Sequence, residues 1–216
     1  MHNSVQKYND IISLIKSKLE GQKIPKIVAV SKTFKLEKIM PLIEFGHQDF
    51  GENKVQEAID KWSDVKVQKP KINLHLIGKL QTNKVKKAVK VFDYIHSLDS
   101  EKLAKKIADE EKNQNKKIKL FIQLNLGDED QKSGLDRNNL LEFYDYCKKL
   151  NLNIIGLMCI PPFNEESEKY FEEMKMFKNK LSLNELSMGM SSDFLKAIKH
   201  ESTYLRIGSN IFGKRS

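Results

Sequence analysis

The sequence predicts an α/β protein built as a (β/α)8 barrel, a TIM barrel, with one extra helix before the first strand. Short apolar runs of strand length alternate with longer amphipathic segments along all 216 residues. The runs number eight, at about 27–32, 48–52, 73–78, 94–98, 119–126, 153–160, 185–190 and 204–208. Strands that alternate with helices form a parallel sheet, and eight such strands close into a barrel.

The segments between the runs have the apolar spacing of helices. Apolar residues recur at helical intervals within Leu36–Ile43, Val55–Trp62, Leu103–Ala108 and Leu140–Cys147. A further helix over about residues 3–20 precedes the first run. Asp99 or Ser100, and Asp136, lie where helix N-caps are expected.

An open, doubly wound sheet is the alternative arrangement of the same elements. No glycine-rich fingerprint follows the first run, so dinucleotide binding to such a sheet is not supported. The run Ile154–Ile160 is apolar on both faces, as expected of a strand covered by helices. The chain contains no linker or low-complexity tract, so we expect residues 1–216 to form a single domain.

Composition indicates a protein of the cytoplasm. Apolar residues make up 39% and charged residues 31%, and no apolar stretch is long enough to cross a membrane. Met1–Glu20 lacks the apolar centre of a signal peptide. Cys147 and Cys159 match no metal-ligand spacing and form no disulfide framework, so we expect neither a metal site nor a disulfide.

The net charge of +9 raises the question of nucleic-acid binding. Lysines are dense at 84–90 and 116–119, but aromatic residues that would stack on bases are not interleaved with them. We therefore expect no nucleic-acid partner. A positive field that attracts small anions is the more modest inference.

The first run ends in a lysine, Lys32, where barrel enzymes place reactive groups. Strand side chains alternate, so Val28, Val30 and Lys32 are expected to share one face. Apolar neighbours would lower the pKa of Lys32 and expose a nucleophilic amine suited to Schiff-base chemistry. Taken alone, this run is better explained by a lysine at a strand end whose side chain reaches into water. The interpretation of Lys32 as a reactive lysine is favoured only when the other predicted strand ends are considered with it.

Other predicted strand ends also carry polar groups. Asn53 follows the second run and offers a donor and an acceptor, although the position equally suits an N-cap. His75, in the third run, is interpreted as a core histidine with satisfied hydrogen bonds. After the fifth run, Lys132-Ser133-Gly134 forms a loop whose glycine permits close approach of the backbone.

The last two predicted strands end in loops rich in glycine and serine. Such loops form the usual phosphate site of a barrel, where glycine admits backbone N–H groups and Ser191 and Ser209 add hydroxyls. Arg206 shares a strand face with Gly208 and should point into the barrel mouth. An inward arginine requires an acceptor, which we expect to be a carboxylate or a ligand atom.

A lysine nucleophile beside a phosphate site is compatible with two chemistries. In a class I aldolase, the lysine attacks the carbonyl group of a sugar phosphate. In a pyridoxal 5′-phosphate (PLP) protein, the lysine holds the aldehyde of PLP while its phosphate docks elsewhere.

Seven motifs between about Ile27 and Arg215 carry a resemblance to a known family. They are Ala29-Val30-Ser31-Lys32-Thr33, Phe50-Gly51-Glu52-Asn53-Lys54-Val55-Gln56-Glu57, His75-Leu76-Ile77-Gly78-Lys79-Leu80-Gln81-Thr82-Asn83-Lys84, Lys132-Ser133-Gly134, Gly156-Leu157-Met158, Leu186-Ser187-Met188-Gly189-Met190-Ser191 and Arg206-Ile207-Gly208-Ser209-Asn210-Ile211-Phe212-Gly213. Together they resemble the pyridoxal-phosphate homeostasis protein family, a single-domain relative of the alanine racemase barrel.

The resemblance implies a fold-type III PLP-binding barrel and assigns six residues to the cofactor. These residues are Lys32, Asn53, Ser191, Arg206, Gly208 and Ser209. Lys32 is implied to carry PLP as a Schiff base, and Ser191, Gly208 and Ser209 to hold the phosphate. Arg206 is implied to face the pyridine nitrogen, and Asn53 to lie near the ring. Position 209 is often threonine in the family, and serine keeps the hydroxyl.

The same resemblance implies a role in intracellular PLP (vitamin B6) homeostasis without established catalysis. A permanently cationic Arg206 disfavours protonation of the pyridine nitrogen, which weakens the ring as an electron sink. Related racemases add a second domain with an opposing tyrosine base, for which this chain is expected to be too short. We therefore expect a monomer that carries PLP, with PLP-dependent apo-enzymes as candidate recipients. A racemase-like PLP enzyme is the alternative.

Overall fold

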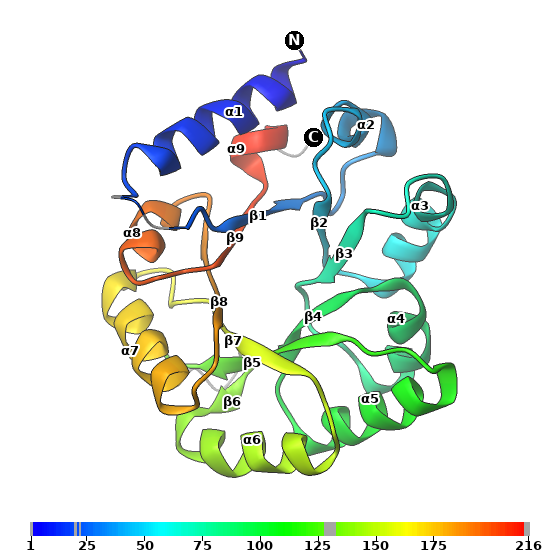
Figure 1. Ribbon diagram of the computed structural model, residues 1–216, viewed down its shortest axis with the longest axis vertical. Helices are drawn as coiled ribbons and strands as arrows, with labels where there is room; N and C mark the ends of the chain where they lie inside the picture. Colours follow the sequence, from blue (N-terminus) through cyan, green and yellow to red (C-terminus); the bar gives the residue numbers. More distant parts are fainter. Residues whose placement is uncertain (1, 20, 22, 128–132, 214–216) are drawn as a thin grey trace.

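The computed structural model contains a closed parallel barrel and describes residues 2–19, 21, 23–127 and 133–213. Within those residues the sheet order is β4-β3-β2-β1-β9-β8-β7-β5-β6, and β4 also pairs with β5, which closes the barrel (Figure 1). The strands are β1 (Lys26–Val30), β2 (Asp49–Glu52), β3 (Asn73–Leu76), β4 (Tyr94–Leu98), β5 (Lys119–Asn125), β6 (Leu135–Asp136), β7 (Ile154–Cys159), β8 (Glu185–Met190) and β9 (Tyr204–Ile207).

The eight strands of the closed barrel coincide with the eight predicted runs, with β1 beginning one residue earlier, and this confirms the (β/α)8 fold class. Pairing of β4 with β5 also excludes the open sheet, which would leave two free edges. The structure adds β6, which pairs with the end of β5. A strand of two residues has no alternating pattern, so the sequence carries no signal for it.

Helices surround the barrel, as the amphipathic segments predict (Figure 1). They are α1 (Asn3–Lys16), α2 (Leu36–Glu44), α3 (Val55–Gln68), α4 (Val85–Val91), α5 (Glu101–Gln114), α6 (Leu140–Lys149), α7 (Ser167–Lys180), α8 (Phe194–Lys199) and α9 (Ser209–Phe212), with 3-10 turns η1 (Thr82–Lys84) and η2 (Arg137–Asn139). In the described part of the chain, no helix combines the length and apolar character needed to span a membrane.

The expected ends of three helices are partly confirmed. The N-terminal helix ends at Lys16, earlier than the expected residue 20, because Ser17 is its C-cap. Ser100 is the N-cap of α5. Asp136 caps η2, where its carboxylate accepts a hydrogen bond from the Asn138 N–H at 2.7 Å.

The apolar core has two layers. The larger layer fills the space between the strands and the surrounding helices, and Phe50 and Trp62 are among its fully buried members. The smaller layer lies inside the barrel, where Val28, Tyr94, Phe121, Met158 and Tyr204 meet from five different strands. Because side chains fill the barrel, ligand sites form at its ends and not along its axis.

Two histidines lie in the barrel interior, fully buried. The His75 ring stacks on Tyr94 with centroids 4.1 Å apart, and the His96 ring stacks on Phe121 at 4.3 Å. Both ring nitrogens of His75 have partners, Asp49 and His96. The interpretation of His75 as a satisfied core histidine is confirmed.

The stability of the fold is expected to decrease from about pH 7.5 to about pH 5.5. Burial lowers the pKa of His75 and of His96, so the unfolded chain takes up protons that the folded chain does not. The free energy of unfolding should then fall by up to about 1.4 kcal/mol per pH unit for each histidine. Urea unfolding at a series of pH values measures this slope. The variant His2→Gln, at an exposed position, should keep it, and a flat profile would contradict the prediction.

Both cysteines are free and buried, as expected for a chain without a disulfide. Burial raises the pKa of the Cys147 thiol and of the Cys159 thiol to about 12. Neither thiol is therefore ionised at neutral pH, and neither is a ready nucleophile.

Candidate functional site

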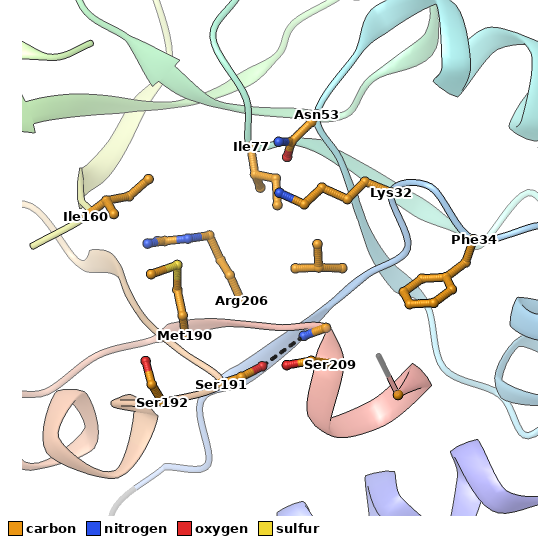
Figure 2. A pocket seen from close by; sticks show the side chains of 13 residues that line it. Lys32, Phe34, Asn53, Ile77, Ile160, Met190, Ser191, Ser192, Arg206 and Ser209 are labelled. Carbon is orange, nitrogen blue, oxygen red and sulfur yellow. Dashed lines mark hydrogen bonds between the residues drawn. The ribbon is translucent and has the colours of Figure 1, made fainter. Parts of the chain in front are cut away.

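A cavity of about 570 Å³ lies at the carboxyl ends of the barrel strands. This volume falls in the usual range of small-molecule sites. Its lining residues are Val30, Lys32, Phe34, Asn53, Ile77, Ile160, Met190, Ser191, Ser192, Arg206, Gly208, Ser209 and Gly213. All six residues that the resemblance assigns to a cofactor are in this set, and Figure 2 shows Lys32, Asn53, Ser191, Arg206 and Ser209 around one space.

Lys32 follows the end of β1 and reaches across the cavity. Val28 is fully buried inside the barrel, whereas Val30 and Lys32 line the cavity, so the three share the predicted inward face. In Figure 2 the Lys32 side chain extends toward Asn53 and Ile77. The amine is therefore presented to the space that a ligand would fill.

Side chains of α3 hold the backbone on both sides of Lys32. Lys61 Nζ donates to the Ser31 carbonyl at 3.0 Å, and the Thr33 N–H donates to Glu57 Oε1 at 2.6 Å. Lys61 and Glu57 are also paired with each other at 3.0 Å. Thr33 has a φ of +67°, which β-branched residues rarely adopt. The bond to Glu57 therefore stabilises an unfavourable turn directly after Lys32.

Glu52 extends this network into the core at the end of β2. Its Oε1 accepts hydrogen bonds from Ser31 Oγ at 2.7 Å, Trp62 Nε1 at 2.9 Å and Lys61 Nζ at 3.0 Å. Burial raises the pKa of the Glu52 carboxyl, and these three donors oppose the rise. The network ties the end of β1 to β2 and to α3, which fixes the position of Lys32.

Asn53 faces the cavity just after β2. The N-cap of α3 is Lys54, so the alternative interpretation of Asn53 as an N-cap is wrong. A Cβ added at Gly78 would lie 2.4 Å from the Asn53 carbonyl oxygen. The loop after β3 thus approaches Asn53 closely enough to require glycine at position 78.

Arg206 lies on β9, with only 4% of its surface exposed. Its Nη1 donates to the Ser187 carbonyl at 2.6 Å and to Ser187 Oγ at 2.7 Å, and its Nη2 donates to the Cys159 carbonyl at 2.8 Å. These acceptors are one hydroxyl and two backbone carbonyls, so the expectation of a carboxylate is not met by them, and a ligand atom as a further acceptor stays a prediction. Every residue carries a backbone carbonyl, so no residue type could have marked the two carbonyl acceptors in the sequence.

Hydroxyl and amide donors gather where the loops after β8 and β9 meet. Ser191, Ser192 and Ser209 line the cavity there, and the Gly208 N–H donates to Ser191 Oγ at 3.4 Å (Figure 2). Asn210 Nδ2 donates to the Ser191 carbonyl at 3.0 Å, which links the two loops. Several small donors in one place suit an anion such as a phosphate group.

Of the motif Lys132-Ser133-Gly134, Lys132 lies outside the described residues. Gly134 has a φ of +137°, and a Cβ added there would lie 2.6 Å from the Asn125 N atom. The predicted close approach of the backbone at this glycine is confirmed.

Sequence reasoning missed several residues that shape the site. Phe34, Ile77, Ile160 and Met190 form its apolar wall, and Ser192 adds a hydroxyl. Most of these residues are inside or next to the motifs, and Ile160 ends a predicted run, but an apolar side chain at a strand end has no pattern that separates a site wall from the core. Only the barrel geometry brings them together.

The chain matches known proteins over nearly its whole length. Residues 6–216 match the family described as alanine racemase, N-terminal domain. A pyridoxal phosphate homeostasis protein of Aquifex aeolicus is 35% identical over 227 residues, covering 99% of this chain and 99% of the relative. The human pyridoxal phosphate homeostasis protein is 36% identical over 211 residues, covering 88% of this chain and 77% of the relative.

Two solved structures of PipY from Synechococcus elongatus share this architecture. PipY without PLP has a TM-score of 0.89 at 32% identity, covering 98% of this chain and 100% of PipY. PipY with PLP bound has a TM-score of 0.87 at 33% identity, covering 97% and 100%. An alanine racemase of Clostridium difficile, 14% identical with a TM-score of 0.73 over 97% of this chain and 56% of its own, shares the fold. The chain therefore belongs to the alanine racemase N-terminal domain family and, within it, to the pyridoxal phosphate homeostasis proteins.

Proposed function

We propose that this protein binds PLP, holds it covalently on Lys32 and serves intracellular PLP homeostasis. The observation that carries the proposal is one cavity that combines an amine, a buried guanidinium and a cluster of hydroxyl and amide donors. PLP presents the matching groups, which are an aldehyde, a pyridine nitrogen and a phosphate. The PLP-bound structure of PipY, a relative with the same fold, supports the same assignment.

The shape of the cavity fits such a molecule. A Cβ added at Gly208 would lie 3.1 Å from the Cβ atom of Val30 and 3.2 Å from its carbonyl oxygen. Glycine at position 208 therefore lets the end of β9 approach Val30 of β1 closely, beside the Ser191 and Ser209 hydroxyls that line the cavity. The phosphate would lie at these donors, and the ring would lie between the apolar wall and Asn53.

Each polar residue then has a separate task. Lys32 Nζ bonds to the aldehyde carbon, and the aldehyde oxygen leaves as water. Ser191, Gly208 and Ser209 bind the phosphate and orient the ring. Arg206 places a permanent cation near the pyridine nitrogen, which opposes protonation of that nitrogen. When bound, PLP supplies an electrophilic aldehyde and an electron-withdrawing ring.

We propose binding and release of PLP, and not turnover of an amino acid, as the role of the site. Racemisation needs proton donors and acceptors on two faces of the substrate carbon. The charged groups among the described lining residues are Lys32 and Arg206, and the other polar side chains there are hydroxyls and an amide. The relatives are named as homeostasis proteins. A single domain, delivery of PLP to apo-enzymes, a monomeric state and a cytoplasmic location are parts of the same proposal.

An absorption spectrum before and after borohydride reduction tests the proposal. We expect the protein, mixed with PLP, to show a visible band that borohydride removes, and peptide mapping to find the reduced adduct on Lys32. No band after addition of PLP would contradict the proposal and favour the aldolase chemistry. Exchange of the α-proton of an amino acid with solvent, catalysed at a useful rate, would contradict the non-catalytic role.

The contact of Glu57 with the Thr33 N–H gives a further prediction. Glu57→Ala is expected to weaken PLP binding about tenfold, because the turn after Lys32 loses a charge-assisted hydrogen bond. Glu57→Gln is the matched control, since its amide oxygen still accepts the Thr33 N–H. Titration of each variant with PLP measures the effect. Equal affinities for the alanine variant and the natural protein would contradict this role of Glu57.

A further inference from the structure

A chain of hydrogen bonds crosses the inside of the barrel from Arg206 to Asp49. Arg206 Nη1 lies 2.7 Å from Ser187 Oγ, and Ser187 Oγ lies 2.8 Å from His96 Nδ1. His96 Nε2 lies 3.0 Å from His75 Nδ1, and His75 Nε2 lies 3.0 Å from Asp49 Oδ1. The five residues belong to β9, β8, β4, β3 and β2, so the chain connects both sides of the barrel wall.

The two ends of the chain lie at opposite ends of the barrel. Arg206 lines the cavity that contains Lys32, at the carboxyl ends of the strands. Asp49 is the first residue of β2 and therefore lies at the amino ends of the strands. Ser187, His96 and His75, which connect Arg206 to Asp49 in this hydrogen-bond chain, are not among the residues that line the described cavity. The chain thus links the proposed PLP site to a carboxylate outside that site.

The chemistry of the ends fixes the direction of every link while both histidines are neutral. Arginine only donates hydrogen bonds, and an ionised carboxylate only accepts them. Ser187 Oγ accepts a hydrogen bond from Arg206, and its hydroxyl donates a hydrogen bond to His96 Nδ1. His96 then carries its proton on Nε2 and donates to His75 Nδ1, and His75 donates from Nε2 to Asp49. The reverse arrangement would place the bare His75 Nε2 against the carboxylate.

Burial shields the middle of this hydrogen-bond chain from solvent and favours neutral histidines. Ser187, His75 and His96 are fully buried. Burial lowers the pKa of His75 and of His96, and Arg206 adds to the effect at His96. Burial raises the pKa of Asp49, but the hydrogen bond from His75, together with the electrostatic interactions of His75, Lys26 and His47, lowers the pKa overall. The other titratable groups that face or act on these residues include Lys26, His47, Asp93, Tyr94, Tyr204, Cys159 and Asp193.

We propose that Ser187, His96, His75 and Asp49 are positioning residues for Arg206. Their chain holds the guanidinium in one orientation at the cavity and connects it to a negative charge at the far end of the barrel. As far as it concerns PLP, this inference rests on the proposed function. The existence and direction of the chain are independent of the cofactor.

The tautomers of the two histidines test the chain without PLP. Nitrogen-15 NMR of the histidine rings distinguishes a proton on Nδ1 from one on Nε2 and from a charged ring. We expect His75 and His96 to be neutral near neutral pH, each with its proton on Nε2. A proton on Nδ1 of either ring, or a charged ring, overturns the proposed direction and with it the proposal.

Two variants test the effect on Arg206. Asp49→Asn keeps an acceptor for His75 but removes the charge, so the cavity becomes more positive and the bound cofactor should take up its proton at a lower pH. We expect the midpoint of the visible-band titration to fall by about half a pH unit. Ser187→Ala breaks the chain next to Arg206 and should raise the dissociation constant of PLP at least about threefold.

Asp60→Asn is the matched control, because Asp60 is an exposed carboxylate on α3 that accepts a hydrogen bond from Gln56 Nε2 at 2.8 Å and lies outside the hydrogen-bond chain. Its titration midpoint should stay close to that of the natural protein. If Asp49→Asn and Ser187→Ala also titrate and bind PLP like the natural protein, the positioning role is overturned. If the natural protein forms no borohydride-trapped band, the proposed function fails, and the NMR tautomers alone decide on the chain.

Discussion

Replacement of Lys32 by alanine is expected to abolish the borohydride-stable attachment of PLP while the barrel stays folded. Lys32 supplies the amine that bonds to the aldehyde, and it follows β1 instead of lying within the packed interior. The visible band should disappear, and mass spectrometry after reduction should find no adduct at position 32. Circular dichroism and urea unfolding should resemble those of the natural protein, because no residue of the core is changed.

Lys54→Ala is the matched control for this experiment. Lys54 is exposed, directly follows Asn53 and makes no side-chain capping hydrogen bond to α3. Its removal changes the charge near the cavity by the same amount, so the band and the adduct on Lys32 should persist. A reduced adduct of normal yield in the Lys32→Ala protein would mean that another lysine carries PLP.

Replacement of Arg206 by methionine is expected to lower both stability and PLP affinity. The change leaves the Ser187 hydroxyl and two backbone carbonyls without the donors that they have now. Loss of a buried partner of this kind costs about 2–3 kcal/mol in the free energy of unfolding. Urea unfolding and PLP titration measure the two effects separately. Without the cation, the pyridine nitrogen should also accept a proton more readily.

Arg206→Lys separates charge from geometry. Lysine keeps the positive charge, but its single ammonium group cannot reproduce the planar fork that reaches Ser187 and Cys159 together. We expect a stability between those of the methionine variant and the natural protein. Unfolding free energy and PLP affinity that both stay unchanged in Arg206→Met would show that the buried guanidinium has neither role.

The periodicity of apolar residues predicted the fold well, because strands and helices have different apolar periods and the barrel alternates between the two. Each of the eight strands of the closed barrel, from Lys26–Val30 to Tyr204–Ile207, lies within or next to a run that the pattern defines. The N-terminal helix was predicted too long because its end depends on a cap at Ser17, and the helical spacing continues past it through Leu19. The strand β6 has two residues and no period to detect.

The site was predictable where a residue type implies its chemistry. A lysine at the end of β1 and serines beside glycines in the last two loops carry that information, and all of them line one cavity. Their contacts with PLP stay predictions. The acceptors of Arg206 could not be predicted, because two of them are backbone carbonyls that any residue supplies.

By itself, the sequence determined the number and order of the barrel strands and the motifs that mark the family, because apolar period and motif residues are local properties of the chain. The tertiary structure decided which side chains meet. Glu57 is 24 positions from Thr33, and His96 is 91 positions from Ser187, yet each pair is joined by a hydrogen bond. Such contacts form only when the sheet closes into a barrel and brings strands and helices that are distant in the sequence next to each other. No local pattern in the sequence encodes which of these residues will meet.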